Sequence, residues 1–150
     1  MKKGFTLVEL MLVVIILGIL VGMVVPRLVG RSEEARKAAA RADIQGSIAT
    51  ALDMFEMDVG SYPNTLAELC KSDSLSDAKK RRWKGPYLKK CTEEGGEVVI
   101  RDPWGNPYEY EPPNAQEGRN IYHLWSWGPN GENDEGEGDD ICSWKDNVEE

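Results

Sequence analysis

The feature that most constrains this chain is an apolar run over residues 5–25 that carries a single charge, Glu9. A helix of this length is about sufficient to cross the ~30 Å hydrocarbon core of a bilayer. A carboxylate at depth in such a helix costs about 2.5–3.5 kcal/mol, which makes Glu9 a candidate functional residue. The end of the run, around Pro26, lacks the small-residue cleavage site of a secretory signal peptide, so we expect the helix to remain in the mature chain.

The segment KGFTLVE at residues 3–9 resembles the N-terminus of type IV filament subunits, the family of type IV pilins and type II secretion pseudopilins. The resemblance implies that a prepilin peptidase removes the leader, residues 1–4, by cutting after Gly4, and then methylates the new amino terminus on Phe5. It also implies that Glu9 is an assembly residue, which pairs with the Phe5 amino group of a neighbouring subunit. The alternative is an ordinary single-pass anchor whose glutamate lies near the membrane surface.

We predict that residues 26–59 continue the membrane helix as an amphipathic segment. Pro26 removes a backbone donor, so we expect a kink or a locally melted turn near it. Beyond it, apolar residues at helical spacing form a stripe that should cover a sheet: Ile44, Ile48, Ala51, Leu52 and Phe55. Gly60 and Pro63 are expected to end the helix.

Residues 60–150 predict one small globular domain. DPWGNPYEY, at residues 102–110, resembles the Asp-Pro-Trp-Gly turn of the major pseudopilins and leads into an alternating strand. A second strand is predicted in IYHLWSW, at residues 121–127, and both of its faces are largely apolar. The segment from Cys91 to Ile100 is an unusual insertion relative to that family.

An acidic, glycine-rich loop follows the second strand, and carboxylate, amide and main-chain oxygens are the ligands that Ca²⁺ takes. The loop resembles the calcium loop of the major pseudopilins. This implies side-chain ligands from Asn130, Asp139 and Asp140, and main-chain carbonyl ligands from Trp127 and Glu132. The family has aspartate where this chain has Asn130, so we expect weaker calcium binding. The alternative is an acidic, disordered tail whose charges are merely solvated.

The chain contains three cysteines, Cys70, Cys91 and Cys142. A domain exported across the membrane lies in an oxidising compartment, where one disulfide is expected. A Cys70–Cys91 bond would clip the intervening loop and contribute about 3 kcal/mol. The sequence leaves Cys142 open as a partner for either of the other two.

The distribution of charge limits the classes of partner that this chain can bind. The net charge is −8, and −10 without Lys2 and Lys3, which argues against nucleic acid as a partner. Residues 71–90 are strongly basic, whereas residues 129–150 are strongly acidic. Two such patches are typical either of complementary contacts between subunits or of solvated faces. Lys2 and Lys3 predict a cytoplasmic N-terminus, which places the rest of the chain outside the cytoplasm.

We expect no enzymatic activity, because His123 is the only histidine and no catalytic set can be assembled around it. The expected fold is α+β, with one long N-terminal helix packed on a small antiparallel sheet and a C-terminal calcium loop.

The resemblance implies a major pseudopilin that forms a helical homopolymer in the periplasm and drives export of folded proteins across the outer membrane. It further implies minor pseudopilins, the inner-membrane secretion platform and the prepilin peptidase as partners. Alternatives are a type IV pilin of a surface pilus and a membrane-anchored calcium-binding module that never polymerises.

Overall fold

The structure, a computed structural model, describes residues 6–118 and 120–145. The leader and Phe5 lie outside these residues. The chain divides at residue 35 into two compact units. The first holds the beginning of helix α1 (Leu7–Ala42), whose large apolar side chains over residues 7–21 are exposed. In the described part of the chain, no helix has both the length and the apolar character that a membrane span requires.

One helical segment runs from Leu7 to Val59 in three consecutive pieces: α1, the π-helix η1 (Asp43–Ile48) and α2 (Ala49–Val59). The backbone is helical at Pro26. The prediction of a locally melted turn there is therefore wrong, and the alternative, a kink, stays a prediction. The π-helix was not predicted. Its Ser47 hydroxyl donates to the Asp43 carbonyl oxygen at 3.4 Å, a bond that competes with the regular main-chain ladder.

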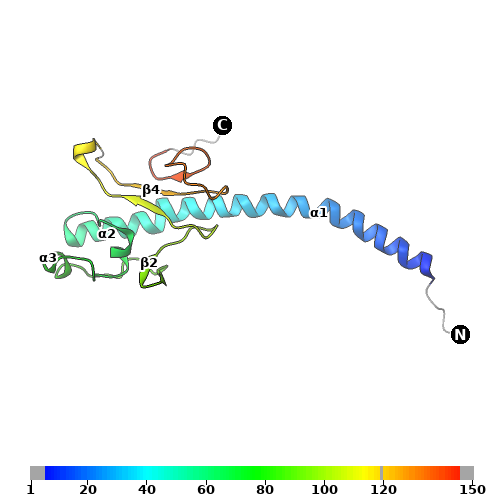
Figure 1. Cartoon of the computed structure of the whole chain (residues 1–150), viewed down its shortest axis with the longest axis horizontal. Helices are drawn as coiled ribbons and strands as arrows, with labels where there is room; N and C mark the ends of the chain where they lie inside the picture. The colour runs from blue at the N-terminus through cyan, green and yellow to red at the C-terminus, as the bar shows by residue number, and fades with distance from the viewer. Residues whose placement is uncertain (1–5, 119, 146–150) are drawn as a thin grey trace. The chain divides into compact units, whose positions relative to one another are not determined.

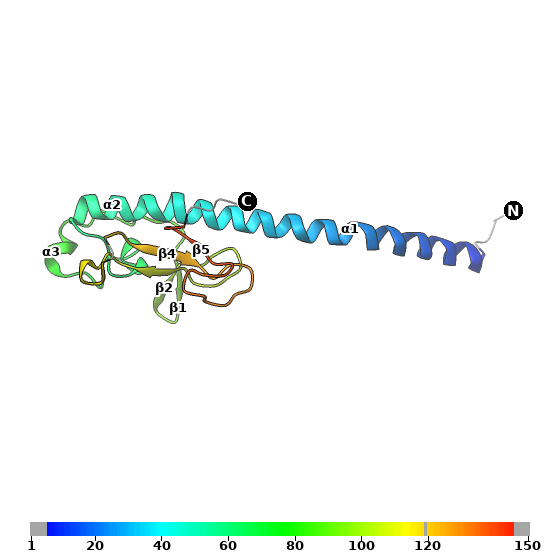
Figure 2. The ribbon, with the colours of Figure 1, turned by 90° about the horizontal axis from the view of Figure 1, so that it is seen from above.

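The helix ends at Gly60, as predicted. Gly60 has φ +91°, in the left-handed region that glycine adopts without penalty, and its N–H donates to the Glu56 carbonyl at 2.7 Å. The short helices η2 (Leu66–Leu69) and α3 (Asp77–Lys80) follow in the loop region. Figure 2 shows α3 at the end of the domain where α2 terminates.

Two small antiparallel sheets complete the domain. Strands β1 (Thr92–Glu94) and β2 (Glu97–Val99) form a hairpin from the inserted segment, closed by Gly95 and Gly96. The second sheet has the order β3 (Glu109–Glu111), β4 (His123–Ser126), β5 (Ile141–Cys142), and η3 (Ala115–Glu117) lies between β3 and β4. Figure 2 shows both sheets on one side of η1 and α2, whereas in the view of Figure 1 β4 is drawn above the helix and β2 below it. A helix combined with small antiparallel sheets is the predicted fold at this level of detail.

The core lies between η1–α2 and the second sheet. The predicted apolar stripe is buried throughout, with at most 1% of each residue exposed: Ile44, Ile48, Ala51, Leu52 and Phe55. It packs in one cluster with Leu69, Leu124 and Ile141. Burial of each of the larger side chains is worth about 1.5–3 kcal/mol, which makes this stripe the principal stabilising contact of the domain.

Asp43 ties the helix to distant parts of the domain. Its carboxylate accepts hydrogen bonds from the Tyr108 hydroxyl at 3.2 Å and from Lys90 Nζ at 3.2 Å. Burial raises the pKa of Tyr108, and the neighbouring Asp43 charge adds to the shift. The phenol therefore stays protonated and donates to Asp43 throughout the ordinary pH range.

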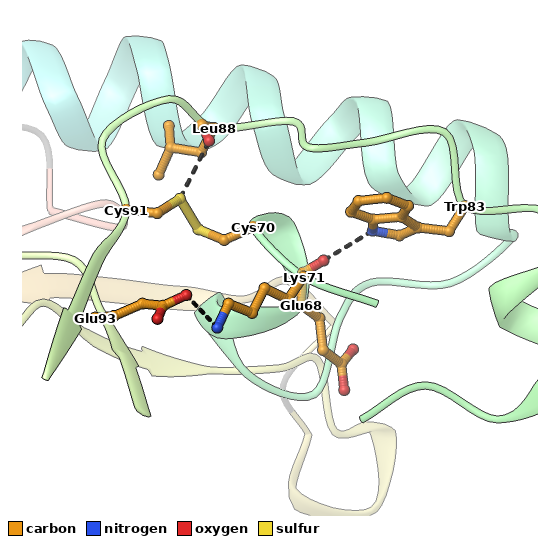
Figure 3. The surroundings of a disulfide bond; sticks show 7 residues. All are labelled: Glu68, Cys70, Lys71, Trp83, Leu88, Cys91 and Glu93. Atoms are coloured by element: carbon orange, nitrogen blue, oxygen red, sulfur yellow. Dashed lines mark hydrogen bonds and ion pairs between the residues drawn. A yellow bond between two sulfur atoms is a disulfide. The ribbon is translucent and has the colours of Figure 1, made fainter. Parts of the chain in front are cut away.

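A disulfide joins Cys70 to Cys91, and Cys142 is a free, buried thiol. Figure 3 shows the bond between the end of η2 and the segment before β1, with the Lys71–Glu93 ion pair beside it. The Trp83 indole donates to the Glu68 carbonyl at 2.9 Å and attaches the basic loop to η2 (Figure 3). The loop of residues 71–90 is therefore held at both ends and near its middle.

Replacing both Cys70 and Cys91 with serine is expected to lower the free energy of unfolding by about 3 kcal/mol, because the unfolded chain regains the freedom of the clipped loop. Urea denaturation of the oxidised full chain and of the double variant measures the difference. Adding a reductant should destabilise the unaltered chain and leave the variant unchanged. Equal stability of the two proteins under oxidising conditions would contradict the prediction.

Candidate functional site

The acidic loop, residues 127–140, is held at both ends by the second sheet. It leaves β4 after Ser126 and returns as β5, whose Ile141 and Cys142 pair with Ser126 and Trp125. Ser143 N also donates to the Leu124 carbonyl at 2.8 Å. The loop therefore connects two paired strands of one sheet, which fix both of its ends. The expectation of a disordered tail does not hold for the described residues.

Three carboxylates converge inside this loop. Single oxygen atoms of Asp134, Asp139 and Asp140 all lie within 4.8 Å of one another, a spacing that can hold a metal ion. Asp139 and Asp140 were predicted to act together. Asp134 was not, although the sequence placed it in the same acidic run. It joins the cluster because its N–H donates to Asp140 Oδ2 at 3.2 Å, which folds the loop back on itself.

Asp140 is the most constrained member of the cluster. Its Oδ2 accepts hydrogen bonds from the N–H groups of Asp134 and Gly136, at 3.2 and 2.8 Å. Its Oδ1 is buried and has no hydrogen-bond partner among the described residues. Burial raises the pKa of Asp140, and the nearby charges of Asp134 and Asp139 act in the same direction. A buried carboxylate oxygen without a donor is costly, and a cation between the three carboxylates would satisfy it.

Asn130 contacts the carboxylates through its nitrogen atoms. Its backbone N–H donates to Asp139 Oδ2 at 3.0 Å, and its Nδ2 donates to Asp134 Oδ2 at 3.3 Å. Its Oδ1 accepts from the Glu132 N–H at 2.7 Å. Ligation through Oδ1 therefore requires the amide to turn. Trp127 directly follows β4, and Glu132 is exposed and directly follows the turn of residues 128–131. The role of their carbonyls stays a prediction.

Two observations indicate that a hard cation fits this loop: the type of ligand atom that converges there, and the close packing of glycines against the aspartates. Every converging side-chain donor is a carboxylate oxygen, the ligand type that Ca²⁺ prefers. Gly128 and Gly138 both have positive φ, and an added Cβ would lie 2.3 Å from the Asp139 carbonyl oxygen and 2.6 Å from Asp134 Oδ2, respectively. A side chain at Gly128 would displace the backbone of Asp139, and one at Gly138 would displace the Asp134 carboxylate. The residues present therefore suit a calcium ion.

The Asp-Pro-Trp-Gly turn supports the entrance to the loop. Asp102 is buried, and its Oδ1 accepts from the Trp104 and Asn106 N–H groups at 3.0 and 2.8 Å. Its Oδ2 accepts from the Ser126 hydroxyl at 2.6 Å, and the Ser126 oxygen accepts from the Gly128 N–H at 3.2 Å. The turn that the sequence predicted thus positions the first residues of the acidic loop.

Asp102→Ala is expected to lower the free energy of unfolding by about 3 kcal/mol, because it removes the acceptor for several buried donors at once. Thermal or urea unfolding of the full chain measures the change. Asp73→Ala, at an exposed aspartate in the basic loop, is the matched control and should stay within about 0.5 kcal/mol of the unaltered chain. Equal effects of the two substitutions would contradict this role of Asp102.

The predicted assembly residue, Glu9, begins helix α1 together with Thr6. The Glu9 N–H donates to Thr6 Oγ1 at 3.3 Å, and the Thr6 N–H donates to Glu9 Oε2 at 3.4 Å. This reciprocal pair is a capping box. Sequence reasoning missed it, although the Thr-x-x-Glu spacing of residues 6–9 was the signal. Glu9 therefore stabilises the first turn of its own helix in addition to any role between subunits.

Two regions of the chain match known families. Residues 27–144 match the family model described as type II secretion system (T2SS), protein G, and residues 1–25 match a prokaryotic N-terminal methylation motif. Type II secretion system core protein G of Pseudomonas aeruginosa is 39% identical over 146 residues, which cover 95% of each chain. The chain belongs to the type II secretion system protein G family.

Other members of the protein G family give the same result. The core protein G of Vibrio cholerae is 38% identical, over 95% of this chain and 92% of the relative. The crystal structure of the major pseudopilin from the type 2 secretion system of enterohaemorrhagic Escherichia coli superposes with a TM-score of 0.56. That match has 25% sequence identity and covers 81% of this chain and 96% of the other. These matches support the secretion-system prediction and not the surface-pilus alternative.

The two candidate sites, the Glu9 capping box and the acidic loop, lie in different matched regions of this protein G family member. Glu9 and Thr6 lie within the methylation motif, together with Gly4 and Phe5, which are outside the described residues. The acidic loop and the Asp102 turn lie within the protein G match. The family is one of structural secretion subunits. The ring of His123 stacks on Trp144, with 4.1 Å between the ring centroids.

Proposed function

We propose that this chain is the major pseudopilin of a type II secretion system, a subunit that polymerises into a periplasmic pseudopilus and drives folded proteins across the outer membrane. The observation that carries the proposal is the pairing of a protein G match over residues 27–144 with a methylation motif over residues 1–25. A methylation motif at the start of a protein G domain supports a subunit that is processed, inserted in a membrane and then assembled.

The N-terminal segment has three consecutive roles in this proposal. Prepilin peptidase removes residues 1–4 after Gly4 and methylates Phe5. Residues 5–25 then hold the subunit in the inner membrane and later form the filament core. Residues 26–59 continue the helix into the periplasm and carry the globular domain, residues 60–150. The exposed apolar side chains over residues 7–21 support the filament-core role, because they are available for burial against lipid or neighbouring helices.

Glu9 is the proposed assembly determinant. In the filament core its carboxylate pairs with the Phe5 amino group of a neighbouring subunit, which removes the cost of an unpaired charge among apolar helices. Both contacts with Thr6 use Oε2, so within the described residues Oε1 is left for this partner. The capping box supports the proposal further, since it holds the Glu9 side chain at the first turn of α1, next to the processed end of the chain.

Calcium is the proposed ligand of the acidic loop. The side chains of Asp134, Asp139 and Asp140 would hold it, with Asn130 and the carbonyls of Trp127 and Glu132 as further ligands. When bound, the ion supplies the positive charge that lets converging carboxylates stay ionised together. Asp140 then has a partner for its buried Oδ1, and the loop is closed on the sheet. The remaining proposed partners are minor pseudopilins and the inner-membrane secretion platform.

A replacement experiment tests the function. This chain is expressed in place of protein G in a bacterium that carries a type II secretion system, and both secretion of an exoprotein and periplasmic or sheared filaments are measured. We expect filaments and restored secretion. Filaments that restore twitching or DNA uptake in a pilin-deficient strain, without secretion, would favour the surface-pilus alternative. A membrane-inserted chain that forms no filament would favour the anchored calcium module.

A further inference from the structure

Asn130, in the acidic loop, is the only asparagine in the sequence that is followed by glycine. It is exposed, and the next residue, Gly131, lies in the left-handed region with φ +71°. Because glycine has no Cβ, nothing attached to its α-carbon shields its backbone nitrogen. Such a nitrogen can attack the side-chain carbonyl carbon of the asparagine before it, which is the first step of deamidation.

The turn holds the Asn130 side chain against the backbone that follows it. Its Oδ1 accepts from the Glu132 N–H at 2.7 Å, an Asx turn in which Cγ of Asn130 and the nitrogen of Gly131 belong to the same hydrogen-bonded ring. The Glu132 N–H also stabilises the negative charge that forms on Oδ1 when a nucleophile attacks Cγ. In the described part of the chain, the Gly131 N–H donates to no acceptor. The attacking nitrogen is therefore unengaged, and its target is held within the same turn.

Asn133, in the same loop, makes the same turn without the reactive nitrogen. It is exposed, and its Oδ1 accepts from the Glu135 N–H at 3.1 Å and from the Trp125 indole at 3.0 Å. The residue that follows it is Asp134, whose side chain shields the backbone nitrogen. The Asp134 N–H is also engaged, because it donates to Asp140 Oδ2 at 3.2 Å. This asparagine therefore shares the exposure and the turn and lacks the free, unshielded nitrogen.

We propose that Asn130 is a deamidation site and that its aspartate product becomes a fourth carboxylate of the calcium cluster. The Gly131 nitrogen forms a bond to Cγ of Asn130, its proton passes to Nδ2, and the Cγ–Nδ2 bond breaks to release ammonia. Water then opens the cyclic imide. Opening at Cγ gives aspartate in the original backbone, whereas opening at the main-chain carbonyl carbon gives isoaspartate. The overall reaction converts an amide and water into a carboxylate and ammonium.

The contacts of Asn130 show what the modification changes in the loop. As an amide, its Nδ2 donates to Asp134 Oδ2 at 3.3 Å and occupies an oxygen of the cluster. An aspartate has no such donor, so its carboxylate faces Asp134 as a like charge unless a cation lies between them. Deamidation thus converts a loop held by its own hydrogen bonds into one that requires a cation. This consequence rests on the proposed calcium site, whereas the modification itself does not.

Ageing of the full chain in detergent tests the modification. Fresh protein is incubated at mildly alkaline pH, which favours attack by the amide nitrogen, and its peptides are followed by mass spectrometry. We expect Asn130 to lose its amide while Asn133 keeps it. Asn114 should keep it too, since its Oδ1 accepts from the Gln116 N–H at 3.1 Å but alanine follows it. Gly131→Asn should prevent the loss, because asparagine tolerates a positive φ and its side chain shields the nitrogen. Equal loss from Asn130 and Asn133, loss from neither, or undiminished loss in Gly131→Asn would overturn the proposal.

Calcium titration tests the consequence for the loop. An aspartate-specific protease, which does not cleave at isoaspartate, measures how much of the aged chain carries aspartate at residue 130. That fraction should bind calcium about tenfold more tightly than fresh chain, and as tightly as Asn130→Asp. Aged chain that gains no affinity, when Asn130→Asp does, would overturn the link between the modification and the ion. Deamidation at Asn130 without calcium binding by either protein would instead overturn the proposed calcium site and leave the modification standing.

Discussion

Glu9→Gln is expected to abolish filament assembly while the chain remains inserted in the membrane. Glutamine preserves the capping box with Thr6, since its side-chain oxygen also accepts from the Thr6 N–H. It removes only the charge that would pair with the amino terminus of a neighbouring subunit. Loss of one partner of a buried ion pair costs about 3–5 kcal/mol, a change of more than about a hundredfold in each association constant. Sheared filaments and membrane fractions, both quantified by immunoblot, give the two readouts.

Thr6→Ala is the matched control for this experiment. It removes the Thr6 side-chain acceptor for the Glu9 N–H, at a cost of about 1 kcal/mol in helix stability, and keeps the carboxylate. We expect near-normal filaments from it. The reverse pattern, with filaments from Glu9→Gln and none from Thr6→Ala, would show that Glu9 acts only as a helix cap. Normal assembly of Glu9→Leu would favour the anchored calcium module instead.

Calcium is expected to raise the thermal unfolding midpoint by on the order of 10 °C when its free concentration is about a hundred times its Kd. At that ratio the bound state gains about 2.7 kcal/mol, and each kcal/mol shifts the midpoint of a domain of this size by about 2–8 °C. Asp139→Ala and Asp134→Asn should each remove most of the shift, because each deletes a converging carboxylate. Glu137→Gln should leave it intact, since Glu137 pairs with Lys145 at 3.0 Å, outside the cluster.

Asn130→Asp should change calcium affinity and the stability of the calcium-free loop in opposite directions. A fourth carboxylate should tighten calcium binding about tenfold, because affinity rises with ligand charge. Without calcium the same change should lower the midpoint, since Asn130 Nδ2 donates to Asp134 and an aspartate would repel it. Titration of the full chain in calcium and in chelator gives both values. No stabilisation by millimolar Ca²⁺, together with an unchanged Asp139→Ala variant, would refute the calcium site.

Features set by local periodicity or turn chemistry were predictable from the sequence. The stripe from Ile44 to Phe55 is buried because helical spacing alone places it on one face. Gly60 ends the helix, and Asp102 closes the predicted turn with its own side chain. Each of these depends on neighbours within a few residues. The Gly95–Gly96 hairpin carried a comparable turn signal, which sequence reasoning treated only as an insertion.

Features that depend on contacts distant in sequence were not predictable. Asp43 meets Tyr108 across 65 positions, and nothing near either residue indicates the pair. Asp134 joins the carboxylate cluster only when the loop folds around Asp140. In the sequence it is one of several neighbouring acidic residues, and nothing marks it as the one that joins the cluster. The π-helix over residues 43–48 was not predictable either, because composition favours a regular helix there.

The disulfide between η2 and the hairpin has a mechanical consequence. In the proposed pseudopilus each subunit carries load along the filament axis, and a segment that unravels under tension would lengthen the chain. Cys70 and Cys91 are 21 positions apart, which corresponds to about 70 Å of extended chain. Their covalent bond bypasses this entire length, so tension passes directly from the end of η2 to the start of β1. The basic loop can then change its contacts under load without making the subunit more extensible.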